Sequence, residues 1–249
     1  MKKPILIGNW KTNPTTFAEA KKNILAIDKK LSNKKQNYLL AVPDIYLSSL
    51  KEIKTRAQIG VQNINGVEQG AHTGVSTAQM AKSVGATFTI LGHSEVRKEG
   101  ETDEKINTKI TQVLASGMDC VLCVGESVRD KEGKYLKFIE QQLMIALKDI
   151  RKDLFSNIII AYEPIWAVGA KDPATPHECF EVAIAIRRTL TGLATIDHAK
   201  KVSILYGGAV DEKNAPIFIK DGGVDGLLIG RASLSPDSFS KIIINCHGK

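Results

Sequence analysis

Long apolar runs are missing from this sequence of 249 residues. A membrane-spanning helix needs about 18 consecutive apolar residues, and no stretch of the chain reaches that length. The first ten residues, MKKPILIGNW, include two lysines, but Gly8 and Asn9 interrupt the apolar run. A secretory signal needs roughly 7–15 apolar residues. We therefore expect a soluble, cytoplasmic protein with no membrane partner.

Cysteine is scarce, with four residues in the chain. Cys120 and Cys123 form a CxxC pattern, which in other settings binds metal or carries redox chemistry. Here the pair lies in DCVLCVG, a run typical of a strand, and residues three apart on a strand point to opposite faces. The two thiols therefore cannot share a metal or a disulfide, and we interpret them as buried structural groups.

The charge of the chain is moderately basic, with a formal net value of +7. Nucleic-acid binding favours a clustered basic patch with interleaved aromatic residues. The lysines here are instead scattered, mostly in helix-like segments such as KKNILAIDKKLSNKK, so we expect no nucleic-acid partner. Two interpretations of the charge remain: a solvated surface, or a positive field that attracts a small anionic substrate.

Eight short apolar runs recur along the chain, with helical patterns between them. The runs are continuous and rich in β-branched residues, without the polar alternation of a half-exposed strand, as is typical of parallel strands buried on both faces. They are ILIGNW from Ile5, YLLAVP from Tyr38, AQIGVQN from Ala57, TFTILGH from Thr87, CVLCVGE from Cys120, NIIIAYEP from Asn157, KVSILYGG from Lys201 and DGLLIGR from Asp225.

The intervening segments carry helix signals. Ser76 precedes TAQMAKSVG, and TDEKINTKITQVLASG opens with acidic residues. Thr175-Pro176 and Ser235-Pro236 each place an N-cap residue before a proline. Eight alternations of strand and helix predict one closed (β/α)8 barrel spanning residues 1–249. An open doubly wound sheet is the alternative, but it usually has a glycine-rich phosphate loop after its first strand, where this chain has GNWK.

Polar residues gather at the ends of the predicted strands, where such barrels place their active sites. Asn9 and Lys11 follow the first strand, His93 the fourth, and Glu163 the sixth. Each alone has an ordinary structural interpretation, as a solvated or paired charge or a structural hydrogen bonder. Together on one barrel face they predict a site. Glycines at the last two strand ends belong to the same set: Gly207, Gly208 and Gly230.

These residue types fit one kind of chemistry. A carboxylate such as Glu163 can take a proton from a carbon next to a carbonyl, and a second group must polarise that carbonyl. His93 precedes what resembles the first turn of a short helix, where an imidazolium is disfavoured, so we expect a neutral donor. Lys11 would supply a positive charge. The glycines and a short helix at 231–234 would let backbone N–H groups bind a phosphate.

The motifs GNWK, GHSE, AYEPIWAVG, YGGAV and IGRASL, in this order and spacing, resemble the triosephosphate isomerase family. The resemblance runs from Pro4 to about Phe239. It implies a (β/α)8 barrel that interconverts dihydroxyacetone phosphate and D-glyceraldehyde 3-phosphate, without cofactor or metal.

The resemblance also assigns residue roles. It implies that Glu163 is the base, His93 the neutral electrophile and Lys11 the charge beside the substrate. Asn9 matches a polar contact to the substrate, and Glu95 a carboxylate that pairs with the lysine. Backbone N–H groups that hold the phosphate are implied at Gly169, Ala209, Gly230 and Arg231.

Two further segments match family features. Residues 164–174 resemble a lid that closes over the phosphate and excludes water, with Tyr206 as one of two latch residues. GVEQGAHTGVS, from Gly66, resembles the loop through which the family forms homodimers. The resemblance implies that Thr73 reaches the neighbouring subunit's site.

The chain departs from the family pattern in the lid. Its second hinge reads Asp172-Pro173-Ala174, and Lys171 stands just before that hinge where the family usually has glycine. Proline should make the hinge stiffer. Ala209 stands where the family has the serine that completes the latch. We therefore expect slower or leakier catalysis, but not inactivity.

Two more departures lie near the dimer loop. Val75 and Val96 replace a glutamate and an arginine that pair across the family's dimer interface, and we expect an apolar contact in place of the ion pair. The stretch 98–100 is one residue shorter than usual, which leaves open where the helix after His93 lies.

Two other functions remain as alternatives. Another phosphosugar barrel enzyme would need a Schiff-base lysine within a strand, or paired His and Asp metal ligands at strand ends, and neither is present in the sequence. A non-catalytic descendant would be expected to lose Lys11, His93 or Glu163, and all three are intact.

Overall fold

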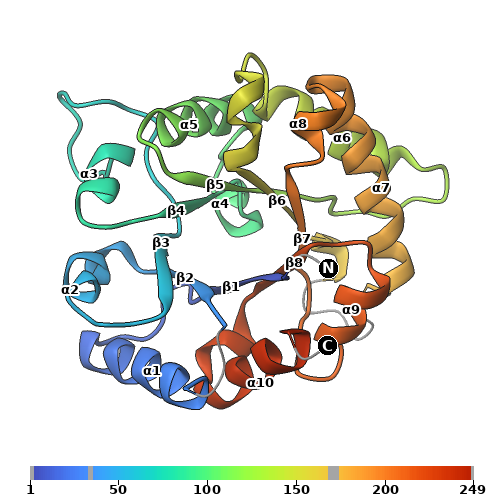
Figure 1. Cartoon of the computed structure of the whole chain (residues 1–249). Helices are drawn as coiled ribbons and strands as arrows, with labels where there is room; N and C mark the ends of the chain where they lie inside the picture. Colours follow the sequence, from blue (N-terminus) through green and yellow to red (C-terminus); the bar gives the residue numbers. More distant parts are fainter. Residues whose placement is uncertain (1–2, 33–35, 168–173, 248–249) are drawn as a thin grey trace.

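Eight parallel strands form a closed barrel in the computed structural model, which describes residues 3–32, 36–167 and 174–247 (Figure 1). Each strand pairs with its neighbours in chain order, and β8 pairs with β1 to complete the cylinder. The open-sheet alternative is therefore wrong and the predicted barrel is confirmed. The strands are β1 (Ile5–Asn9), β2 (Tyr38–Val42), β3 (Ala57–Val61), β4 (Phe88–Leu91), β5 (Asp119–Val124), β6 (Ile158–Tyr162), β7 (Ser203–Tyr206) and β8 (Gly226–Ile229).

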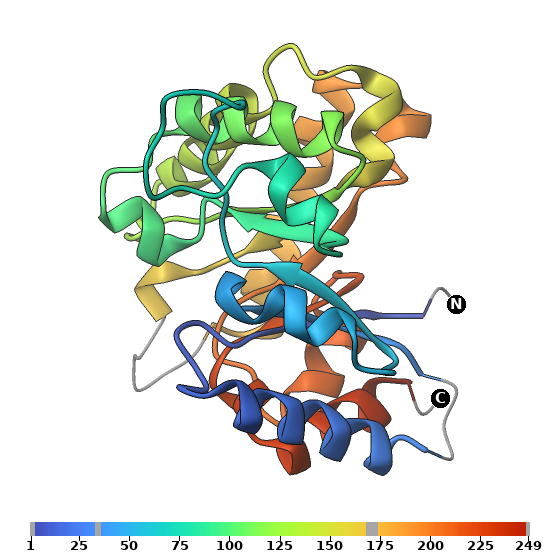
Figure 2. The same cartoon turned by 90° about the vertical axis from the view of Figure 1, so that its left-hand side faces the viewer.

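Helices surround the barrel as an outer layer (Figures 1 and 2). The first and last of them, α1 and α10, lie side by side and close the ring. The α-helices are α1 (Phe17–Lys30), α2 (Leu47–Lys51), α3 (Ala78–Ser83), α4 (Ser94–Lys98), α5 (Asp103–Ala115), α6 (Lys134–Ala146), α7 (Pro176–Leu193), α8 (Ile196–Ala199), α9 (Ala215–Asp221) and α10 (Pro236–His247). Short 3-10 helices are η1 (Asp44–Tyr46), η2 (Lys152–Asn157), η3 (Ile165–Ala167) and η4 (Arg231–Leu234).

The apolar side chains form two separate cores, because a parallel strand points alternate residues to opposite faces. One core fills the barrel interior and includes Ile7, Phe88 and Cys123. The other lies between the strands and the helices and includes Cys120. The two cysteines therefore occupy opposite faces of β5 as buried free thiols, which confirms their structural interpretation.

Threonine side chains cap the N-termini of several helices. Thr175 and Glu178 form a reciprocal capping box at the start of α7, with Pro176 in the first turn, as the sequence predicted. Thr102 caps α5. At α3 the capping side chain is Thr77, one residue after the Ser76 that marked this helix start in the sequence.

Gly125, directly after β5, sets the spacing at the mouth of the barrel. A Cβ atom there would lie 1.8 Å from the carbonyl oxygen of Glu163, so only glycine lets the two chains approach. The N–H of Glu163 donates to the carbonyl of Val124 over 2.8 Å, which extends the β5–β6 pairing by one residue. The end of β6 is thus held in place by main-chain contacts.

None of the helices in the described ranges has both the length and the apolar character needed to cross a bilayer.

Candidate active site

Four of the predicted residues converge at the carboxyl ends of the strands. The His93 Nε2 atom lies 3.1 Å from the Glu163 Oε1 atom. The Lys11 Nζ atom lies 2.5 Å from Glu95 Oε1, and the other oxygen of Glu95 is 3.8 Å from His93 Nδ1. The barrel therefore joins residues from three βα loops into one connected polar cluster.

Glu163 is a buried carboxylate, with 4% of its surface exposed. Its Oε2 atom accepts a hydrogen bond of 2.9 Å from the backbone N–H of Ser94, at the start of α4. Burial raises the pKa of Glu163 above its ordinary value, against the opposing effects of the Ser94 N–H and the positive charge of Lys11. A carboxylate in this setting has a stronger tendency to take up a proton than an exposed one.

His93 is the N-cap of α4, so the short helix expected after it is present and begins at Ser94. Its Nδ1 atom accepts the N–H of Glu95 over 3.2 Å. A ring nitrogen that accepts a hydrogen bond carries no proton, so the imidazole donates from Nε2, the atom that faces Glu163. This geometry is the one expected of a neutral imidazole that acts as a donor.

Lys11 has a left-handed backbone, with φ of 51°, which is uncommon for a residue other than glycine. Its N–H donates to Asn9 Oδ1 over 3.0 Å, and its carbonyl accepts from the Gln62 side chain over 2.8 Å. Asn9 thus serves as a support for the lysine within the chain. Backbone strain of this kind is held by surrounding contacts and concentrates at functional sites.

Glu95 and Lys11 are each more than a third exposed, so their ion pair contributes little to stability. Partial burial acts to raise the pKa of Glu95, but the hydrogen bond and the charge of Lys11 outweigh it and lower the pKa. The pair therefore acts mainly to position the lysine Nζ, through a carboxylate that also lies 3.8 Å from His93 Nδ1.

The predicted phosphate-binding segment also lies at this mouth. The short helix expected at 231–234 is η4, which begins directly after Gly230. A Cβ atom added to Gly230 would approach the Lys11 Cε atom at 3.8 Å, which places β8 beside Lys11 at the mouth. Ala209 and Arg231 are exposed, whereas Gly169 lies outside the described residues.

Tyr206, the predicted latch residue, ends β7 as a buried side chain stacked on Phe218, with ring centroids 3.8 Å apart. Its hydroxyl is buried and has no hydrogen-bond partner within residues 3–32, 36–167 and 174–247. Burial raises the pKa of Tyr206 well above its usual range. A Cβ atom on Gly208 would lie 2.3 Å from this hydroxyl, so the glycine leaves room for it.

The predicted lid, residues 164–174, is described only at its two ends. Residues 165–167 form η3, in which the Trp166 Nε1 atom donates to Glu126 Oε1 over 2.6 Å. Ala174 is buried and leads into the Thr175 cap of α7. The departures at Lys171, Asp172 and Pro173 lie outside the described residues.

Sequence reasoning missed several supporting groups, namely the Ser94 N–H, Gln62 and Glu126. The first is a backbone atom that no side-chain pattern reveals. Gln62 lies in the quoted run AQIGVQN and Glu126 ends the run CVLCVGE, so both occupy the strand-end positions that supplied the predicted site. Their position at strand ends could therefore have identified them as site residues. The sequence does not show which groups they contact.

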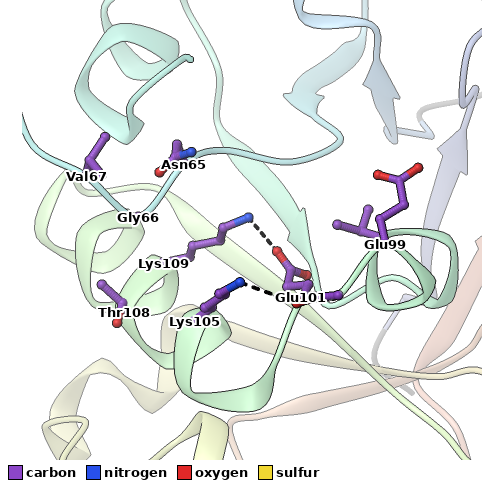
Figure 3. Close-up of a pocket in the computed structure, with 10 residues that line it drawn as sticks. Asn65, Gly66, Val67, Glu99, Glu101, Lys105, Thr108 and Lys109 are labelled. Carbon is purple, nitrogen blue, oxygen red and sulfur yellow. Dashed lines mark hydrogen bonds and ion pairs between the residues drawn. The ribbon is translucent and has the colours of Figure 1, made fainter. Parts of the chain in front are cut away.

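The loop between β3 and α3, which contains Thr73 and Val75, projects from the body of the protein (Figures 1 and 2). Thr73 is exposed. The base of this loop borders a surface pocket of about 440 Å³, which is also lined by Val96 and by the ion pair of Glu101 with Lys109. Lys109 lies beside Gly66 at the loop base, and its ammonium group points to Glu101 (Figure 3). Glu101 also accepts the N–H of Gly92 over 3.1 Å, which ties this pocket to the segment before His93.

The described part of the chain contains no group of three or more His, Cys, Asp or Glu side chains placed to hold a metal ion.

Comparisons with known proteins agree with the geometry. The family model described as triosephosphate isomerase matches residues 4–246. Triosephosphate isomerase from Thermoanaerobacter pseudethanolicus is 36% identical over 98% of this chain and 99% of its own length. The one from Mesomycoplasma hyorhinis is 38% identical over 98% of each chain. The crystal structure of triosephosphate isomerase from Bartonella henselae superimposes with a TM-score of 0.86 at 34% identity, covering 98% of each chain.

The raised pKa of Glu163 predicts a pH effect on stability. Between the ordinary carboxyl value of 4.5 and the raised folded value, the folded state binds more protons than the unfolded state. The free energy of unfolding should therefore fall as the pH rises through that window. In Glu163→Gln this contribution should vanish, as thermal unfolding of both proteins at a series of pH values would show.

The control is Glu140→Gln, since Glu140 is exposed on α6. Parallel pH profiles for the parent protein and Glu163→Gln would contradict this assignment.

Proposed function

This chain belongs to the triosephosphate isomerase family and is an isomerase, and we propose that Glu163, His93 and Lys11 carry its reaction. The reaction interconverts dihydroxyacetone phosphate and D-glyceraldehyde 3-phosphate. The observation that carries the proposal is the 3.1 Å approach of His93 Nε2 to Glu163 Oε1 in the mouth of the barrel. A base and a donor this close can act on adjacent atoms of one small substrate.

In the proposed mechanism, Glu163 takes the proton from the carbon next to the substrate carbonyl. The electron pair of the broken C–H bond forms the enediolate, and its negative charge develops on the carbonyl oxygen. His93 donates a hydrogen bond from Nε2 to that oxygen, and Lys11 adds a positive charge. The hydroxyl proton on the neighbouring oxygen must also move to the former carbonyl oxygen, a transfer that His93 Nε2 can relay by giving its proton to one oxygen and taking the proton of the other. Glu163 then returns the carbon proton to the former carbonyl carbon as the neighbouring carbon becomes the new carbonyl, which yields the other triose phosphate with no cofactor.

The phosphate is proposed to bind the backbone N–H groups of Ala209, Gly230, Arg231 and Gly169. Support comes from the start of η4 at the carboxyl end of β8, because N–H groups at a helix start are unpaired donors that suit an anion. Residues 164–174 would then form the lid over the bound substrate, with Tyr206 as a latch. Its buried hydroxyl, which lacks a partner in the described residues, suits that role.

We propose in addition that the chain forms a homodimer through the loop around Thr73 and that it works in the cytoplasm. Support for the dimer comes from the projecting loop and from the pocket at its base. In a two-fold dimer, the loop of each copy could contact the pocket of the other. Thr73 would then complete the neighbouring site.

Glu163→Asp is predicted to separate chemistry from binding. The shorter side chain withdraws the base by about one methylene, and misplacement of this size can lower turnover about 100-fold. Turnover of glyceraldehyde 3-phosphate should fall accordingly, while inhibition by inorganic phosphate stays unchanged. Glu104→Asp, on the exposed side of α5, is the matched control. Equal losses of turnover and phosphate binding would count against Glu163 as the base.

Ala209→Ser is predicted to tighten the closed lid. An added hydroxyl could form one hydrogen bond, which contributes about 0.5–1.5 kcal/mol, or up to roughly a tenfold change in the closed population. Turnover should rise, or less methylglyoxal should form per isomerisation, as both products measured together would show. Ala18→Ser, on the exposed face of α1, should change neither. An Ala209→Ser enzyme identical to its parent would remove the latch argument.

Salt should not weaken the proposed dimer strongly. Val75 and Val96 are both partly exposed in the single chain, and an apolar contact between them lacks the charge attraction that ions screen. Sedimentation at roughly 0.05 and 0.5 M NaCl should give similar dimer affinities. Val96→Arg should weaken the dimer by adding an unpaired charge. Strong dissociation of the parent protein in salt would refute the apolar contact.

A further inference from the structure

One arginine side chain holds the ends of β4 and β5 together at the mouth of the barrel. The backbone pairing of these two strands ends at Leu91 with Leu122. Beyond that pair, the Nε atom of Arg97 donates to the carbonyl of Gly92 over 2.7 Å, and its Nη2 atom donates to the carbonyl of Cys123 over 3.2 Å. The guanidinium therefore continues the contact between the two strands where their main-chain pairing stops.

Arg97 reaches these carbonyls from α4, the short helix that begins after His93. Its backbone N–H donates to the His93 carbonyl over 3.0 Å, so the arginine is anchored on the same turn as the histidine. Its Nη1 atom donates to Asp103 Oδ1 over 2.7 Å, and 14% of its side chain is exposed. A planar guanidinium presents its N–H groups in a fixed fork, so it can hold three separate acceptors better than a lysine ammonium can.

Gly92 occupies the narrow space beside this guanidinium. Its φ is 69°, a left-handed conformation that favours glycine. A Cβ atom there would lie 3.0 Å from both Arg97 Nη2 and the Cys123 carbonyl oxygen. The Gly92 N–H donates to Glu101 Oε2 over 3.1 Å, so charged side chains hold both polar groups of this residue. The peptide bond that leads into His93 therefore has little freedom to rotate.

The β5 end held by Arg97 also places Glu163. Cys123 directly precedes Val124, whose carbonyl accepts the N–H of Glu163 over 2.8 Å. Arg97 thus joins the backbone next to His93 to the backbone that holds Glu163. The side chains carried by these two backbone segments meet at 3.1 Å, between His93 Nε2 and Glu163 Oε1.

We propose that Arg97 is a positioning residue for the reaction, which fixes the separation of His93 and Glu163 by joining the strand ends beside them. This inference rests on the proposed function, in which the imidazole and the carboxylate act on adjacent atoms of one substrate. Arg97 acts through the backbone and does not touch the reacting atoms. Catalytic groups must be held within about 0.5 Å of their working geometry, which requires supporting side chains that are themselves fixed.

A second arginine offers a matched control at the opposite end of the barrel. Arg187 on α7 donates from Nη1 to the carbonyl of Val202 over 3.1 Å and from Nη2 to Asp225 Oδ2 over 2.5 Å. Val202 and Asp225 directly precede β7 and β8, so this guanidinium joins the amino ends of two strands. Arg187→Met should therefore lower stability without changing the mouth.

The first test follows His93 without any activity. In the structure its Nδ1 atom accepts an N–H, and its Nε2 atom faces Glu163. Nitrogen-15 NMR of histidine-labelled protein reports the protonation and surroundings of each ring nitrogen. His93→Asn identifies the His93 signals among those of the five histidines. In Arg97→Met the His93 ring signals should shift, whereas in Arg187→Met they should match the parent protein.

The second test measures turnover of glyceraldehyde 3-phosphate and its inhibition by inorganic phosphate, at a concentration where parent and variants sediment alike. Arg97→Met should lower kcat about 10- to 100-fold, because the two catalytic groups lose their fixed separation. KM and phosphate inhibition should stay unchanged, since the proposed phosphate-binding groups follow β7 and β8. Arg97→Lys keeps the charge opposite Asp103 and should recover part of kcat. Arg187→Met should keep the parent kcat and lower only the thermal unfolding midpoint.

The outcomes separate this proposal from the proposed function. Either a parent-like kcat or parent-like His93 signals in Arg97→Met would overturn the proposal, even if the unfolding midpoint falls, and would make Arg97 a structural ion-pair residue. If Arg97→Met does not fold, Arg97→Lys is judged by the same two measurements. If the His93 signals move in the variant but the parent protein does not isomerise triose phosphates, the placement of His93 by Arg97 stands and the proposed function fails.

Discussion

The burial of the Glu163 carboxylate is the constraint on which the rest of the mouth depends. A charge taken out of water needs compensation, and here it comes from the Ser94 N–H and from the His93 ring. Both groups are in place only because α4 begins directly at the end of the β4 loop. The carboxylate itself is placed by the close contact between β5 and β6, which requires Gly125. The position of this single buried carboxylate, at the end of β6, thus depends on how the ends of β4 and β5 are placed.

Much of this arrangement could be predicted from the sequence, and the reason is geometric. Parallel strands buried on both faces produce apolar runs that are easy to recognise, and closure of the barrel brings their carboxyl ends together. The convergence of Lys11, His93 and Glu163 therefore followed from the order of the runs alone. The family resemblance added the roles of these residues, but their approach to one another is a consequence of barrel closure.

The supporting interactions could not be predicted in the same way. The hydrogen bond from Gln62 to the carbonyl of Lys11 links positions 51 residues apart, and it depends on the left-handed backbone of Lys11. The contacts of Arg129 depend on how a long side chain crosses from the β5–α6 loop to α7. The hydrophobic periodicity of the sequence does not predict these contacts, because they are set by packing between elements. Only the placement of Gln62 and Glu126 at strand ends was visible beforehand.

Glu126 and Glu178 both face Arg129, but they differ in how they hold their charge. Burial raises the pKa of Glu126, despite the opposing hydrogen bonds from its own backbone and from Trp166 and Tyr162. Burial also acts to raise the pKa of Glu178, but hydrogen bonds from the backbone and side chain of Thr175 outweigh it and lower the pKa. As the pH falls, Glu126 therefore takes up its proton before Glu178 does. The attraction between Arg129 and Glu126 is therefore lost while the Thr175 cap of α7 persists. Glu126, beside Trp166, is thus a desolvated carboxylate of the same kind as Glu163 at the mouth of the barrel.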